Sequence, residues 1–79
     1  MALPKPGRLT LADGDEVVID RVWYTTSPPG TYRVTFRKGG EPYGCKAWFR
    51  KGRWTEWIPG EAATEEDRQQ ARERSEDLF

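Results

Sequence analysis

The sequence predicts a small, mainly β domain: an antiparallel β-meander of four or five strands, or a small open barrel, followed by one C-terminal α-helix. Three observations predict it. Runs rich in β-branched and aromatic residues recur at short, even spacing between Gly-containing turns. One run, residues 31–37 (TYRVTFR), alternates cleanly between apolar and polar. After residue 60 the chain becomes strongly polar, with three acidic residues in succession where a helix would begin. All strand pairs are expected to be antiparallel.

The first two strands are predicted at residues 8–12 and 16–24. Asp-Gly between them is a strong turn signal, because both residues tolerate positive φ. The apolar side chains of the second strand change face half-way along, with Val17 and Ile19 on one side and Val22 and Tyr24 on the other. A β-bulge near residues 20–21 would put all four on one face. A strand that is partly covered on both faces is the alternative.

Three further strands are predicted at residues 31–37, 45–50 and 54–58. Residues 25–30 are expected to be a loop, since a Pro-Pro pair does not fit a hydrogen-bonded ladder. Residues 38–44 are expected to form a hairpin loop, and residues 51–53 a tight turn. The inward faces of these strands predict the buried core: Val17, Ile19, Tyr32, Val34, Phe36, Ala47 and Phe49.

A helix is predicted from an N-cap at Thr64 to about residues 75–77, with acidic residues 65–67 in its first turn. Ala71 is the only apolar residue between Thr64 and Leu78, so the helix lacks an apolar stripe. Three interpretations stay open: a solvated appendage held by Leu78 and Phe79, a helix that packs back over the basic body, or a handle for a basic partner. Residues 1–60 are accordingly taken as the β-meander domain, and residues 61–79 as an acidic helix in the same domain or appended to it.

The stretch LADGDEVVI (residues 11–19) resembles the opening of SH3-like barrels, which implies a small open barrel. The order of strands over residues 31–58 followed by a helix is similar in outline to the sheet-plus-helix DNA-binding modules at the N-termini of some integrases. Both are resemblances of shape.

Composition argues against several classes of function. One cysteine and no histidine exclude an internal disulfide and a Cys/His zinc site, and we expect no metal and no cofactor. No apolar run approaches a membrane span, and the first residues lack the apolar segment of a signal peptide, so a cytoplasmic protein without membrane contact is expected. Without a histidine base, Ser27 and Ser75 have no evident activator, and Cys45 is expected to be a buried structural thiol. We therefore expect no catalytic residues and no enzyme activity.

Charge is divided along the chain. Residues 1–60 carry ten Lys/Arg and six Asp/Glu, a net charge of +4, whereas residues 61–79 carry three Arg and seven Asp/Glu, a net charge of −4. The neutral total therefore hides a basic body and an acidic tail.

The candidate site is the outward face of the hairpin formed by residues 31–37 and 45–50. Basic side chains bind phosphates, and an exposed Trp can stack on an unpaired base. The predicted ligand-binding residues are Arg33, Arg37, Lys46, Trp48, Arg50 and Arg53. The function predicted from them is a binding module for nucleic acid or another anionic surface. A solvated strand face, which also needs polar residues, explains the same pattern, and the pI of about 6.3 is low for a nucleic-acid binder.

The alternative function is a protein–protein accessory or inhibitor module of the phage or mobile-element type. Its contacts would come from the acidic helix and from exposed Trp residues. Trp54 and Trp57 lie on opposite faces of the last strand, so at most one is fully inside. The other is expected to be partly exposed, together with Trp48 and Trp23.

Overall fold

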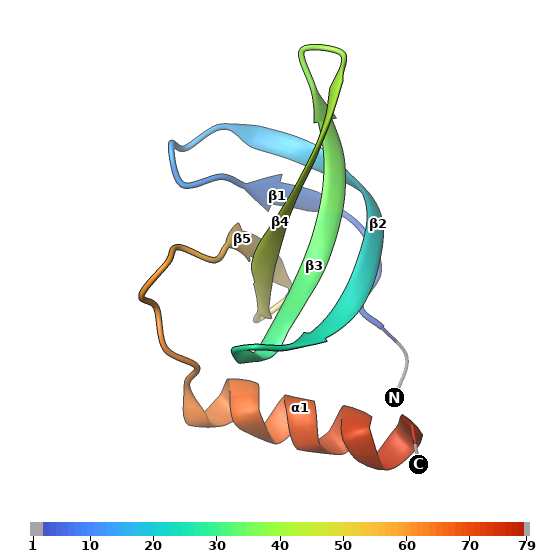
Figure 1. Ribbon diagram of the computed structural model, residues 1–79, viewed down its shortest axis with the longest axis vertical. Coiled ribbons are helices and arrows are strands. Elements are labelled where there is room, and N and C mark those ends of the chain that lie inside the picture. Colours follow the sequence, from blue (N-terminus) through green and yellow to red (C-terminus); the bar gives the residue numbers. More distant parts are fainter. Residues whose placement is uncertain (1–2, 79) are drawn as a thin grey trace.

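Five strands close into a barrel in sequence order, and one helix lies across an end of it (Figure 1). The elements are β1 (Arg8–Thr10), β2 (Glu16–Thr26), β3 (Pro29–Lys38), β4 (Glu41–Arg50), β5 (Arg53–Glu56) and α1 (Glu65–Leu78). The computed structural model describes residues 3–78, with the side chains of Thr26 and of residues 75–78 left out. The prediction of a small β-barrel with one C-terminal helix is confirmed.

The barrel is closed by a parallel pair of strands, which the sequence analysis did not predict. β1 pairs antiparallel with β2 and parallel with β5, where Leu9 lies opposite Trp54. Each successive strand of a meander reverses direction, so the first and fifth strands run the same way and can meet only in parallel. The prediction of exclusively antiparallel pairs in an open barrel is therefore wrong in this respect.

The β-bulge predicted near residues 20–21 is confirmed. The register between β2 and β3 shifts between Ile19, which lies opposite Phe36, and Arg21, which lies opposite Thr35. Ile19 is buried in the core, and three further β2 side chains pack against that core: Val17, Val22 and Tyr24. One extra residue thus keeps the apolar side chains of a long, curving strand on one side.

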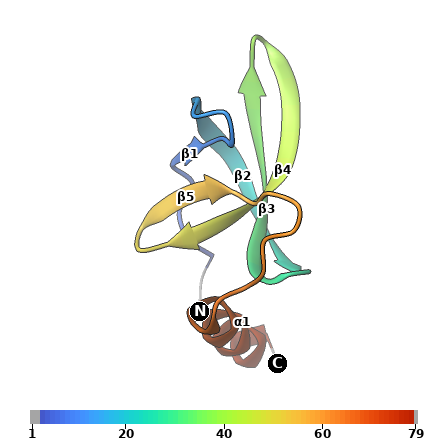
Figure 2. The ribbon, with the colours of Figure 1, turned by 90° about the vertical axis from the view of Figure 1, so that its left-hand side faces the viewer.

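Two predicted loops are mostly strand. β2 and β3 are joined by Ser27 and Pro28 alone, and β3 and β4 by Gly39 and Gly40 alone. Pro29 lies opposite Thr26 as the first residue of β3, a position where a missing N–H is tolerated. The two glycines have φ of 61° and 81°, as a tight hairpin turn requires. Their hairpin projects from the end of the barrel opposite α1 (Figure 2).

The core is a cluster of seven buried residues: Leu9, Ile19, Tyr32, Val34, Phe36, Ala47 and Trp54. Val17 and Phe49, predicted to be buried, are partly buried and pack against this cluster. Leu9 and Trp54 were not predicted as core residues. The Trp54 ring packs 5.4 Å from the Tyr32 ring and 4.8 Å from the Phe49 ring, between centroids, so aromatic contacts supply much of this small core.

Helix α1 packs on the barrel through a polar face. The helical face toward the barrel is made of four residues at spacing i, i+3, i+4 and i+7: Asp67, Gln70, Ala71 and Arg74. The Tyr24 hydroxyl donates to the Ala71 carbonyl at 2.9 Å, and the Arg74 guanidinium lies 4.5 Å from the Tyr32 ring centroid. Cation–π and polar contacts with two tyrosines of the barrel therefore replace the missing apolar stripe.

Gly30 allows the close approach of α1. Its φ is +89°, and a Cβ built there would lie 2.6 Å from the Asp67 Cβ. Proposed anchoring by Leu78 and Phe79 lies outside the described side chains. Within residues 3–78, no helix combines the length and the apolar character that a membrane crossing requires.

Candidate nucleic-acid interface

Four side chains form a row across the outer face of the barrel. Trp23 of β2 lies opposite Arg33 of β3, and Arg33 lies opposite Lys46 of β4. The Trp57 backbone N–H, just beyond β5, donates to the Lys46 carbonyl at 2.8 Å. We call Trp23, Arg33, Lys46 and Trp57 the basic–aromatic row. Three strand spacings separate its ends, a span of about 14 Å.

The β-bulge is what turns Trp23 outward. Before the bulge, odd-numbered residues such as Val17 and Ile19 point inward; after it, Val22 and Tyr24 do so. Trp23 is consequently 42% exposed. The Arg21 guanidinium lies 5.7 Å from the Trp23 ring centroid, which adds a cation to this edge of the row.

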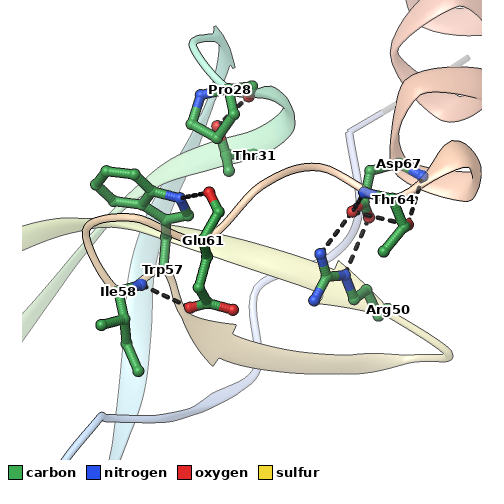
Figure 3. A network of polar contacts seen from close by, with 8 residues as sticks. All are labelled: Pro28, Thr31, Arg50, Trp57, Ile58, Glu61, Thr64 and Asp67. Atoms are coloured by element: carbon green, nitrogen blue, oxygen red, sulfur yellow. Dashed lines mark hydrogen bonds and ion pairs between the residues drawn. The ribbon is translucent and has the colours of Figure 1, made fainter.

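A hollow of about 400 Å³ lies over the row and is lined by Trp23, Tyr24, Thr25, Ser27, Arg33 and Lys46. The Lys46 ammonium donates to the Ser27 carbonyl and lies 5.3 Å from the Trp57 ring centroid. The Trp57 indole N–H donates to the Glu61 carbonyl at 3.1 Å, which holds the ring at the end of the row (Figure 3). Residues 21–25, 31–37 and 44–50 contain no Asp or Glu, so these strand segments carry only positive charge.

Of the predicted site residues, the structure brings Arg33 and Lys46 together. Arg37 is also on the outer face of β3, but its guanidinium turns toward the hairpin and donates to the Gly40 carbonyl at 2.6 Å. Arg53 begins β5 and lines a different hollow of about 760 Å³, together with Lys5 and Arg8. These two arginines are therefore not part of the row.

Trp48 is not the exposed stacking platform that the sequence analysis predicted. Its side chain points outward as expected but is only 1% exposed. The Arg50 guanidinium lies 3.9 Å from the Trp48 ring centroid, and α1 holds that guanidinium in place through Asp67. The prediction is wrong because strand alternation predicts only the direction in which a side chain points. It does not predict which residues from other parts of the chain cover that side chain.

Trp23 and Trp57 of the row, and Arg21 beside Trp23, were not among the predicted ligand-binding residues; apart from Trp48, exposed Trp residues were assigned only to the alternative protein-partner function. The break in alternation in β2 was the signal for Trp23 and Arg21.

Asp67 joins the helix cap to the barrel (Figure 3). Its carboxylate accepts from Arg50 Nε at 3.1 Å and from Arg50 Nη2 at 2.6 Å. The same carboxylate accepts from the Thr64 N–H at 2.8 Å and from the Thr64 hydroxyl at 2.9 Å, while the Asp67 N–H donates to the Thr64 hydroxyl oxygen at 3.2 Å. This reciprocal pair is a capping box, so one residue both starts the helix and docks it.

We expect α1 to leave the barrel in acid. Burial, the largest influence, would raise the pKa of Asp67, but hydrogen bonds from Arg50 and Thr64 and the Arg50 charge together hold it below its usual value. A lowered folded-state pKa stabilises docking fully above the unfolded pKa of about 3.9, and this stabilisation is lost as the pH falls through the folded value. The helical far-UV signal should therefore decline below about pH 4. In Asp67→Asn, the helical far-UV signal should no longer decline below about pH 4. If this variant showed the same pH dependence as the wild type, Asp67 would not be the titrating group.

Cys45 has the properties of a structural thiol. It packs against the core, and burial together with the Glu56 charge raises its pKa to about 11. A thiol with that pKa is almost entirely protonated near neutral pH, which makes it a poor nucleophile.

Comparison of the chain with protein-family models, with curated proteins and with solved structures finds no match. We therefore infer the function from the geometry of the basic–aromatic row.

Proposed function

We propose that this protein is a non-catalytic module that binds single-stranded nucleic acid through the basic–aromatic row. The observation that supports it is the exposed Trp23 ring next to the paired cations Arg33 and Lys46 on adjacent strands. Stacking of a base on an aromatic ring contributes about 1–3 kcal/mol, whatever the base. Cations beside the ring neutralise the phosphates. A single strand fits this arrangement better than a duplex, because its bases are free to leave the stack.

The ion pairs of α1 weigh against the alternative function, in which the negative charge of this helix would attract a basic partner protein. On the exposed side of α1, Glu65 pairs with Arg68 at 3.5 Å and with Arg72 at 3.1 Å. The buried carboxylate of Asp67 is used against Arg50. Part of the negative charge of the tail is thus already neutralised within the molecule. The attraction of α1 for a basic partner is therefore weaker than its composition indicates.

Two substitutions test the proposed function in different ways. Trp23→Ala should weaken the binding of a fluorescent oligothymidylate of about eight nucleotides by ~1–3 kcal/mol, with little change in salt dependence. Arg33→Ala should weaken binding and also make the slope of log affinity against log salt shallower by about 0.7, because one phosphate contact is lost. Fluorescence anisotropy across a salt series measures both effects.

Matched controls use residues outside the row. Tyr43, an exposed aromatic of the projecting hairpin, and Arg8, an exposed cation of β1, should each tolerate substitution by alanine without loss of affinity. Equal losses for Trp23→Ala and Tyr43→Ala would show that the row is not the site. Absence of binding by the wild-type protein at about 100 µM in low salt would refute the nucleic-acid function itself.

A further inference from the structure

The outer face of β4 continues the basic–aromatic row toward α1. At two-residue steps from Lys46, the outward side chains are Trp48 and then Arg50. Trp48 stands next to Thr31 of β3, two residue pairs from the pairing of Lys46 with Arg33. A cation, an aromatic ring and a second cation therefore follow one another along a single strand. Trp48 is buried against the Arg50 guanidinium, and Arg50, 32% exposed, is held by Asp67 of α1.

The Asp67 carboxylate occupies the position that a phosphate would take. Arg50 holds both carboxylate oxygens, with Nε on one and Nη2 on the other. This two-point geometry is also the one by which arginine recognises phosphate. The Arg50 guanidinium is stacked on Trp48, whose indole N–H has no hydrogen-bond partner within the described structure.

Helix α1 is held on the barrel by polar and cation–π contacts, one of which carries an energetic cost. Arg74 is 4% exposed, and its Nε and Nη1 lack hydrogen-bond partners in the part of the chain that the structure describes. Burial lowers the pKa of Arg74, a sign that the charged form is poorly solvated there. A buried charge without a counter-charge opposes docking. An isolated helix of 14 residues is also marginal in water, so α1 depends on its contacts with the barrel, among which Asp67–Arg50 is the ion pair seen in the described residues.

We propose that Trp48 and Arg50 form a second nucleotide subsite, masked by α1 and opened when a phosphate of the bound single strand displaces the Asp67 carboxylate. This inference rests on the proposed function and adds its regulation: the row receives the strand first, and release of α1 extends the site along β4. The ligand of the subsite is one nucleotide phosphate, held by the Arg50 guanidinium that stacks on Trp48.

Asp67→Asn, compared with Glu66→Gln, tests the subsite. Each substitution removes one negative charge from the same turn of the full-length protein, but only Asp67 touches Arg50; Glu66 is exposed. If only the state with α1 undocked can use the subsite, the apparent affinity is reduced in proportion to the fraction of molecules in that state. A variant in which α1 is always undocked then gains about tenfold when that fraction is about 10% in the wild type. Affinity for the oligothymidylate should therefore rise about tenfold in Asp67→Asn, and less than about twofold in Glu66→Gln. Adding Trp48→Ala to Asp67→Asn should abolish the gain.

The outcomes separate the two proposals. Equal effects of the two charge substitutions would overturn the masked subsite and leave the function of the row intact, provided that the wild type binds and Trp23→Ala weakens it. No binding by any variant would overturn both. A second measurement needs no variant: amide hydrogen exchange of α1 in the wild-type protein, with and without saturating oligothymidylate. Loss of protection in α1 on binding supports the proposal, whereas unchanged or increased protection refutes it.

Discussion

Trp54→Ala is expected to unfold the protein or to lower its melting temperature by at least about 12 °C. The Trp54 ring is 3% exposed, contacts Tyr32 and Phe49, and donates its indole N–H to the Lys5 carbonyl at 3.1 Å. Truncation of a buried aromatic to alanine costs about 3–5 kcal/mol, because transfer energy is lost and a cavity remains. In a domain of this size each kcal/mol lowers the melting temperature by about 4–8 °C.

The position of Trp54 makes the effect larger than burial alone suggests. It lies in β5, a strand of four residues that pairs with β4 on one side and with β1 on the other. Loss of its ring weakens the contact by which the barrel closes. Thermal unfolding measured by circular dichroism gives the result, and Trp23→Ala, which removes an exposed Trp from the same barrel, is the control. Similar melting temperatures for these two variants would contradict the assigned core.

Sequence patterns correctly predicted the features of this fold that depend on neighbouring residues, namely strand alternation, the β-bulge and the helix start. Clean alternation in residues 31–37 placed Tyr32, Val34 and Phe36 inside, where they are buried. In β2 the apolar residues change from one face of the strand to the other, which predicted a bulge. One inserted residue brings both sets of apolar side chains onto the same core. The start of α1 followed from its capping residues.

Features that depend on contacts between distant segments were not predictable in this way. Closure of the barrel through Leu9 and Trp54 joins residues that are far apart in sequence, and it is this closure that buries both. The same applies to the candidate site. Arg33 and Lys46 were found because they lie in one hairpin. The Arg50 guanidinium that lies against the buried Trp48 is held by Asp67 of α1, and the polar sequence of α1 gave no sign of where the helix would pack.

The bulge links the fold to the proposed function. A single extra residue in β2 keeps Val22 and Tyr24 in the core and, by the same change of phase, sends Trp23 to the surface beside Arg33. Without it, Trp23 would point inward and the row would lose its exposed ring. Structure and site thus depend on one irregularity that the sequence already indicates.

Arg50→Ala is expected to release α1 and to weaken its docking by about 2–3 kcal/mol. The Asp67 side chain is 1% exposed, so without Arg50 its carboxylate would remain buried without a counter-charge. Removal of one partner of a fully buried ion pair costs about 3–5 kcal/mol. We expect the lower cost of about 2–3 kcal/mol here because the Arg50 side chain is 32% exposed. Undocking lets the carboxylate reach water, and the released helix then melts. The helical far-UV signal should fall, and the α1 amides should lose protection against hydrogen exchange.

Two comparisons make this prediction specific. Arg68→Ala removes an arginine from an exposed pair with Glu65, and should change docking by less than about 0.5 kcal/mol, because surface ion pairs contribute little. Asp67→Asn also releases α1 but keeps Arg50, so only that variant should gain affinity for the oligothymidylate; Arg50→Ala should not, since the phosphate-binding group of the masked subsite is gone. If the α1 amides in Arg50→Ala stayed as protected as in the wild type, Asp67 would not be what holds the helix on the barrel.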